Sequence, residues 1–153
     1  MIEVNNLTTV KIDEDFFKKI AKKVLEREKK ESKNLSIALI GQGRIRELNK
    51  RYRGKNRATD VLAFPNNKFG LGEIAICLRE VKKNAKRFGS VFEKELVRVL
   101  IHGILHLLGY DHEISPKREK EMETKQNYYL KLFFKSMNPK IHLHLRSLRG
   151  LNK

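Results

Sequence analysis

The sequence predicts one domain of the α+β class, with a mixed β-sheet of about four strands packed against about five or six helices. Its 153 residues are enough for one domain with a buried core. Segments rich in β-branched residues and segments with apolar residues every three to four positions follow one another along the chain. Their order is strand, helix, strand, helix, strand, strand and then helices, which is typical of a mixed sheet covered by helices.

The N-terminal part of the chain predicts two strands with a helix between them. β-branched residues in 1–12 indicate an edge strand. Asp13 can cap the helix that follows, and the apolar residues of that helix recur at helical spacing to about Lys30. The apolar segment 35–40 indicates a second strand that ends at glycines, and a short helix is expected after it.

The middle of the chain predicts a basic loop and two strands. Residues 51–60 have no periodicity and include four cations, so we expect a loop there. Residues 61–64 indicate a short buried strand that Pro65 stops, and 72–77 indicate another. The single cysteine, Cys77, excludes an internal disulfide and fits a reducing cytoplasm. We expect Cys77 to be a core residue and not a reactive thiol.

The C-terminal part predicts three helices. Residues 78–88 form the first, and a central helix with a continuous apolar stripe begins near Val91. Gly109 stands where a left-handed C-terminal cap belongs. The pair 115–116, serine followed by proline, marks the start of the last helix.

The charge balance favours a polyanionic partner. The chain has 34 Lys and Arg residues against 18 Asp and Glu residues, a net charge of +16, and its pI is about 10.1. Such an excess favours contact with nucleic acid. The alternative is a heavily charged, solvated surface, which explains the number of charges but not their imbalance. We expect 1–137 to form the domain and 138–153, which have no acidic residue, to form a loosely held basic tail.

The sequence contains no signal for a membrane. No apolar stretch approaches the ~20 residues that a membrane span needs. The N-terminus has no basic region followed by an apolar segment, which a secretory signal would have. We therefore expect a cytoplasmic protein with no membrane partner.

Three of the five histidines fall within residues 102–112. His102 and His106 are four residues apart, so on a helix they lie on one face and can reach one metal ion. Gly109 lets the chain leave the helix, and His112 can then approach the same ion from another direction. The pattern predicts one zinc ion per chain, bound by His102, His106 and His112, with a fourth position for water as in catalytic zinc sites.

The histidine spacing resembles the zinc-protease pattern H-E-x-x-H-x-x-G-x-x-H with one difference. Position 103, where the proteases have the glutamate that acts as general base, is Gly103. This argues against peptide hydrolysis by the usual route, although a metal ion can still activate water or polarise a phosphoryl oxygen. For a protease, Glu73 is the carboxylate to inspect. Asp111 is either a hydrogen-bond acceptor for a ligand imidazole or a turn residue, and Tyr110 is expected to pack.

Three blocks of the sequence carry a family resemblance. They are Asn49-x-x-Tyr52-Arg53-Gly54-Lys55 followed by Thr59-Asp60-Val61-Leu62-x-Phe64-Pro65, then Leu71-Gly72-Glu73-Ile74 with Ile76, and His102-Gly103-x-x-His106-Leu107-x-Gly109-Tyr110-Asp111-His112. In this order and spacing, from about residue 35 to 135, the chain resembles the YbeY family, the endoribonucleases and rRNA maturation factors of bacteria.

The resemblance implies a zinc-dependent, single-strand-specific endoribonuclease of the cytoplasm. Its implied partners are single-stranded RNA, the rRNA precursor and the small ribosomal subunit, and its implied roles are 16S rRNA 3′-end maturation and ribosome quality control. No small-molecule cofactor is expected. The family pattern places the three histidines on zinc and Arg53 in the cleft near the metal. Ala63 stands where the family usually has serine, and the tail lies outside the matched region.

The chemistry of the basic loop agrees with an RNA substrate. Arg53 offers a planar, permanently charged fork that suits a phosphate, and we predict that it and His112 are catalytic. Lys55 and Arg57 are expected to contact RNA phosphates together with Arg53. Two alternatives stay open: a metalloprotease-like hydrolase, and a non-catalytic RNA-binding assembly factor with structural zinc. No general base is assigned, and three-imidazole sites also take nickel, cobalt or copper.

Overall fold

The computed structural model describes residues 1–66, 68, 70–110 and 115–136. In these residues it contains a mixed sheet of four strands and five helices, as the sequence predicts. The strands are β1 (Ile2–Asn6), β2 (Leu35–Leu39), β3 (Val61–Pro65) and β4 (Gly72–Ile76), and the helices are α1 (Glu14–Arg27), α2 (Gln42–Arg53), α3 (Leu78–Arg87), α4 (Phe92–Leu107) and α5 (Pro116–Ser136). The predicted basic tail lies outside the described residues.

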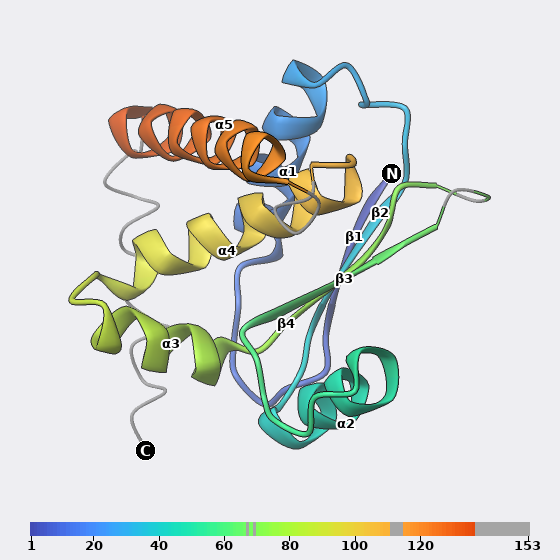
Figure 1. Cartoon of the computed structure of the whole chain (residues 1–153), viewed down its shortest axis with the longest axis vertical. Coiled ribbons are helices and arrows are strands. Elements are labelled where there is room, and N and C mark those ends of the chain that lie inside the picture. The colour runs from blue at the N-terminus through green and yellow to red at the C-terminus, as the bar shows by residue number, and fades with distance from the viewer. Residues whose placement is uncertain (67, 69, 111–114, 137–153) are drawn as a thin grey trace.

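The sheet has the strand order β1-β2-β4-β3. Strands β1, β2 and β4 are parallel, and β3 runs antiparallel beside β4. Figure 1 shows helices α1, α3, α4 and α5 on one side of the sheet and α2 on the other. No helix in the described ranges is both long and apolar enough to cross a membrane.

The sheet separates two apolar clusters, because successive side chains of a strand point to opposite faces. Ile74 and Ile76 of β4 belong to the larger cluster, which includes the buried faces of α1 and α4. Ala75, between them, belongs to a smaller cluster with Leu62 of β3 and Ile45 of α2. The core that supports α4 is therefore on one face only.

Strand β1 is an edge strand, as predicted, but it ends at Asn6 instead of continuing to residue 12. The side chain of Asn6 ends the strand. Its Oδ1 accepts a hydrogen bond from the backbone N–H of Thr8 at 3.0 Å, and its Nδ2 donates to the carbonyl oxygen of Val10 at 2.6 Å. Such a turn is a common competitor of strand pairing at asparagine, even among β-branched residues.

Helix α2 is longer than predicted, so the assignment of 51–53 to a loop was wrong. The helix ends at Arg53, and Gly54 adopts a φ of 68° and donates its N–H to the carbonyl oxygen of Lys50 at 3.1 Å. This left-handed residue is a helix C-cap. The buried side chain of Asn49 then holds the loop, because its Nδ2 donates to the carbonyl oxygen of Arg57 at 2.9 Å.

Both ends of the segment after α4 are as predicted. Gly109 has a φ of 97°, and its N–H donates to the carbonyl oxygen of His106 at 3.1 Å. At the start of α5, the Oγ of Ser115 accepts a hydrogen bond from the N–H of Arg118 at 3.2 Å. The chain thus leaves α4 and enters α5 through two defined caps.

A polar cluster around Glu28 connects the end of α1 to α4 and α5. Tyr110 donates a hydrogen bond to Glu28 Oε1 at 2.9 Å, and Tyr129 and Lys125 donate to Oε2 at 2.9 Å and 3.1 Å. Burial raises the pKa of Glu28, but the hydrogen bonds from Lys125, Tyr110 and Tyr129 and the charge of Lys125 outweigh it, so the net pKa is below the ordinary 4.5. The cluster fixes the chain immediately after α4.

We predict that Glu28→Gln lowers the free energy of unfolding by about 2 kcal/mol at neutral pH, because charged hydrogen bonds are removed and an NH₂ group faces Lys125. The native pKa of Glu28 is lower than its unfolded value, so its contribution is complete above 4.5 and is lost as the pH falls through the native pKa. Urea denaturation of both proteins should show a difference that narrows below pH 4.5.

The matched control is Glu26→Gln, an exposed position on the same helix, where we expect a change within about 0.5 kcal/mol. A difference between Glu28→Gln and the native chain that stays constant down to acid unfolding would contradict this account of the cluster.

Candidate functional site

Helix α4 lies directly against the sheet at Gly103. A Cβ atom added there would be 3.1 Å from Cγ2 and 3.2 Å from Cδ1 of Ile74 on β4, which is closer than ordinary contact. Position 103 therefore faces the sheet. Around the helix axis, His102 is about 100° and His106 about 60° from position 103, and both are displaced in the same direction. Both histidines lie on one flank of α4, as the spacing predicts.

The ring of His102 is held by α5. Its Nδ1 is 3.0 Å from the side-chain oxygen Oε1 of Gln126. Because an amide oxygen only accepts hydrogen bonds, Nδ1 carries a proton in this contact, and in the neutral ring Nε2 then carries the lone pair. An imidazole fixed in this way is typical of a metal ligand, whose second nitrogen donates to an oxygen acceptor.

His106 is one turn further along, close to the end of α4. It is half-buried, and its Nδ1 is fully buried. In the part of the chain that the structure describes, no group of three potential metal ligands forms, so this pair supplies two. His112 and Asp111 lie outside the described residues, and the role of His112 as third ligand stays a prediction. The two described histidines fit a metal ion in position and in the tautomer of His102.

Neither of the two positions considered for a metalloprotease carboxylate, 103 and 73, presents a carboxylate to the histidine pair. Position 103 faces the sheet at close contact, without space for a glutamate. Glu73 is exposed on β4, and its neighbour Ile74 is the residue that faces α4. Since side chains alternate along a strand, Glu73 points to the opposite face of the sheet from the histidines.

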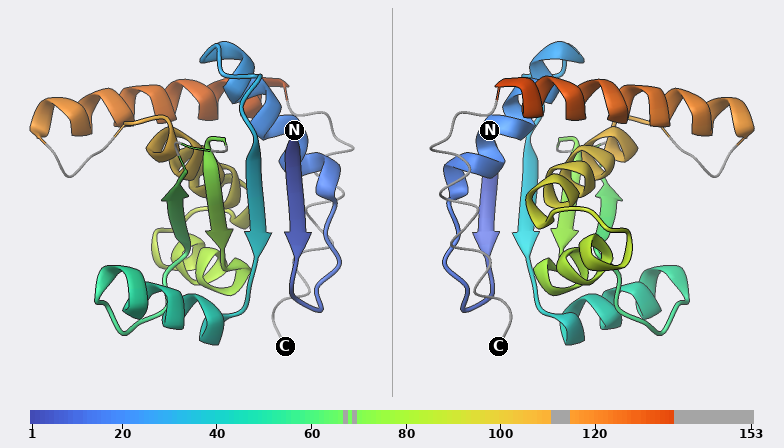
Figure 2. Two further views of the ribbon diagram at one scale, coloured as in Figure 1. Left: turned by 90° about the vertical axis from the view of Figure 1, so that its right-hand side faces the viewer. Right: turned by 90° about the vertical axis from the view of Figure 1, so that its left-hand side faces the viewer.

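The predicted RNA-binding residues gather around the end of α2. Arg53, Lys55 and Arg57 are all exposed. Beside them, Tyr52 is 59% exposed, and its ring meets the ring of Phe64 at a centroid distance of 5.3 Å. In Figure 2, α2 lies at one end of the strands and the C-terminal end of α4 lies near the other. The structure thus brings the two histidines together and places the basic loop toward the opposite end of the sheet.

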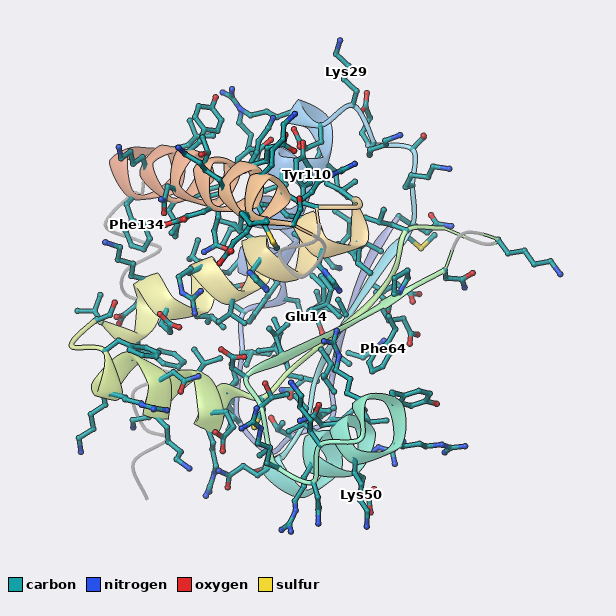
Figure 3. The ribbon with its side chains drawn as sticks, viewed as in Figure 1. Glu14, Lys29, Lys50, Phe64, Tyr110 and Phe134 are labelled. Atoms are coloured by element: carbon teal, nitrogen blue, oxygen red, sulfur yellow. The ribbon has the colours of Figure 1, made fainter. Side chains whose placement is uncertain are left out.

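Other residues singled out in the sequence have structural roles. Cys77 is buried, and burial raises the pKa of its thiol, so the expectation of a core residue is confirmed. Tyr110 packs as expected and also donates a hydrogen bond to Glu28. Figure 3 shows Tyr110 near the end of α4. Ala63 pairs with Ile74 and lies on the α4 side of β3, so the family's serine would present its hydroxyl there.

Two functional features had no clear signal in the sequence. Gln126 is 24 positions from His102, and nothing in the local pattern of α5 connects them. The second feature is an ion pair on α4, where Arg98 Nε donates to Glu95 Oε2 at 3.1 Å and Glu95 is buried. The hydrogen bond to Glu95 raises the pKa of Arg98. The three-residue spacing of Glu95 and Arg98 on a helix was the sequence signal that could have predicted this ion pair.

We predict that Gly103→Glu, which restores the protease glutamate to the sequence, lowers the free energy of unfolding by about 3 kcal/mol or more. The new side chain would collide with Ile74 and place a charge in the apolar interface. The control is Lys94→Glu, an exposed position on the same helix, which should be nearly neutral. Chemical denaturation measures both. A stable Gly103→Glu protein with unchanged α4 packing would show that this interface is looser than the structure indicates.

The fold and the histidine pair define an α+β protein in which a central helix on a mixed sheet presents two imidazoles at metal-ligand spacing. Similarity to known proteins agrees with this description. The sequence model of the family described as Endoribonuclease YbeY matches residues 3–133. The chain belongs to this family.

Two relatives and one solved structure show the extent of the similarity. A Thermotoga neapolitana protein named Endoribonuclease YbeY is 45% identical over 118 residues, which are 76% of this chain and 79% of that protein. A Persephonella marina protein of the same name is 40% identical over 123 residues, 76% of this chain and 80% of that protein. A solution structure of a Thermotoga maritima protein has a TM-score of 0.62 and 38% identity, and the match covers 86% of this chain and 87% of that one.

Proposed function

We propose that this chain is a zinc-dependent endoribonuclease that cleaves single-stranded RNA in the cytoplasm. Its substrates would be ribosomal RNA precursors on the small ribosomal subunit, with roles in 16S rRNA 3′-end maturation and ribosome quality control. The observation that carries the proposal is the His102–His106 pair, with His102 oriented by Gln126 and no carboxylate base at position 103. The family membership and the names of the relatives support the same activity.

The residues divide into metal ligands and RNA contacts. His102, His106 and His112 would hold the zinc ion. When bound, zinc supplies a water of lowered pKa and a Lewis acid for a phosphoryl oxygen. Gln126 would keep the proton of His102 on Nδ1 and leave Nε2 as the nitrogen that could bind the ion. Arg53, whose loop lies toward the other end of the sheet, would bind a phosphate further along the same RNA strand with its fork of N–H donors.

The electrostatics and the exposed aromatic ring suit an RNA strand. The net charge of +16 attracts a polyanion, and the exposed cations Lys55 and Arg57 follow Arg53 in one loop. Tyr52 offers an exposed ring, and the guanidinium carbon of Arg51 lies 5.6 Å from its centroid. A ring next to cations is typical of surfaces that bind unpaired bases, which stack on the ring while cations contact the backbone.

We predict that His102→Ala, His106→Ala and His112→Ala each abolish metal-dependent cleavage of single-stranded RNA and leave the fold largely intact. Chelation of the native chain should have the same effect, and zinc should restore activity. The measurement is cleavage of labelled RNA, with metal analysis of the same samples. His142→Ala, at a histidine beyond the residues that the family model matches, is the matched control and should cleave like the native chain.

Full activity in a ligand variant or in chelator would contradict the zinc mechanism. A protein substrate assayed in parallel separates the nuclease from a protease. A zinc-loaded chain that binds RNA without cleaving it would support the non-catalytic assembly factor instead.

We predict that Gln126→Leu weakens zinc binding by about 10- to 100-fold, because the acceptor that fixes the His102 ring is removed. Gln126→Glu, which keeps an oxygen acceptor, should bind zinc nearly as well as the native chain. Zinc affinity is measured by competition with a chelator. Nitrogen NMR of the metal-free protein should show the Nδ1-protonated tautomer of His102 in the native chain and a mixture in Gln126→Leu. Asn127→Leu, on the adjacent exposed position, is the control. Native zinc affinity in Gln126→Leu would show that Gln126 does not position this ligand.

A further inference from the structure

A groove separate from the histidine pair lies between the end of α1 and α5. Its volume is about 890 Å³, within the range of about 300–1,000 Å³ found for ligand pockets. Most of its lining is apolar, but its polar groups are distinctive. They include Arg27, the last residue of α1, Tyr110, and Lys117, Lys120, Tyr128 and Tyr129 of α5.

The groove presents an ordered aromatic ring to solvent. Tyr128 is 47% exposed. Arg27 Nη1 donates to Tyr128 Oη at 2.7 Å, and the Arg27 guanidinium carbon lies 5.9 Å from the ring centroid. The ring of Tyr129 meets the Tyr128 ring in an edge arrangement, with the two centroids 5.2 Å apart. The ring is therefore held in place while nearly half of the residue stays accessible to a ligand.

The charge of the groove is positive. Four basic and two acidic side chains line it. One of the acids, Glu28, already accepts hydrogen bonds from Lys125, Tyr110 and Tyr129, so its charge is offset within the protein. Lys117 and Lys120 are exposed at the N-terminal end of α5. A ligand in the groove would thus meet a fixed ring with cations at both ends.

The groove and the histidine pair use opposite faces of α5. At 100° per residue, Lys117 and Tyr128 are about 180° and 200° around the helix from Gln126. Gln126 contacts His102, so Lys117 and Tyr128 face away from that contact. An α-helix with side chains is about 10–12 Å across. A strand bound both at the histidines and on Tyr128 would have to cross from one face of α5 to the other, which several nucleotides of unpaired RNA can do.

We propose that this groove binds a segment of single-stranded RNA that flanks the cleavage site, with a base on Tyr128 and phosphates on Lys117 and Lys120. The inference rests on the proposed function, because it names a second contact for the same substrate. Bases stack on aromatic rings beside cations without sequence preference, which matches a groove that has rings and cations but few amide or carboxylate readers. A groove for an acidic peptide is the competing assignment, and measurements of RNA binding separate the two.

The test is binding of labelled single-stranded RNAs of about 4 and about 16 nucleotides, measured by fluorescence anisotropy in chelator so that cleavage is stopped. Tyr128→Ala should weaken binding of the longer RNA about tenfold, as removal of one stacking ring does, and leave the shorter RNA unchanged. Lys117→Gln with Lys120→Gln should reduce the salt dependence of the longer RNA by about 0.7 in slope for each phosphate that is no longer neutralised.

The chain offers a matched control for each variant. Phe88 is another exposed ring with an arginine, Arg87, 5.7 Å from its centroid, and it lies at the end of α3. Phe88→Ala should bind both RNAs like the native chain. Lys86→Gln with Lys94→Gln removes the same charge from exposed positions away from the groove. This double variant should weaken the binding of both RNAs equally or leave it unchanged.

The outcomes separate the two proposals. If the native zinc-loaded chain neither binds nor cleaves RNA, the proposed function fails and this inference fails with it. If the native chain cleaves RNA, but Tyr128→Ala and the double lysine variant bind the longer RNA with native affinity, only the groove assignment is overturned. A peptide is then the better assignment for the ligand of the groove. Circular dichroism and urea denaturation confirm that the variants fold.

Discussion

The contact between Gly103 and Ile74 is the constraint on which the candidate site depends. It lets α4 lie on β4 with its backbone nearly touching a side chain of the sheet. That contact fixes the rotation of the helix about its own axis, and the rotation decides where His102 and His106 point. A larger residue at 103 would move the helix outward or turn it, and the two imidazoles would move with it. The position that carries the catalytic glutamate in zinc proteases is thus used here for packing.

The orientation of the site depends further on contacts from distant parts of the chain. Gln126 of α5 fixes the ring of His102. The Glu28 cluster fixes α5 and Tyr110 relative to the end of α1. Because Tyr110 comes directly before the segment with His112, the cluster sets where that segment begins. These polar contacts are few, but each is partly buried, where hydrogen bonds to a charged group contribute most.

The sequence predicted the fold well where local chemistry decides it. The caps at Gly109 and Ser115 were correct because left-handed glycine and serine N-caps act within a few residues. The end of α2 was missed because its last turn is exposed and has little apolar periodicity, and Gly54 closed the helix later than expected. Gln126 and Glu28 were missed for a different reason. Their partners are 24 and 82 positions away, and no periodic pattern records such contacts.

The arrangement of the proposed RNA contacts gives a physical reason for a preference for single strands. The basic loop after α2 and the histidine pair lie toward opposite ends of the sheet, and the groove faces away from the histidines across α5. A path that joins the three changes direction around a helix about 10–12 Å across. A duplex is stiff over far longer distances and keeps its bases stacked in pairs, so it can neither follow that path nor place a base on Tyr128. An unpaired strand would do both without first losing base pairs, so the proposed separation of the contacts would select against paired RNA without reading any sequence.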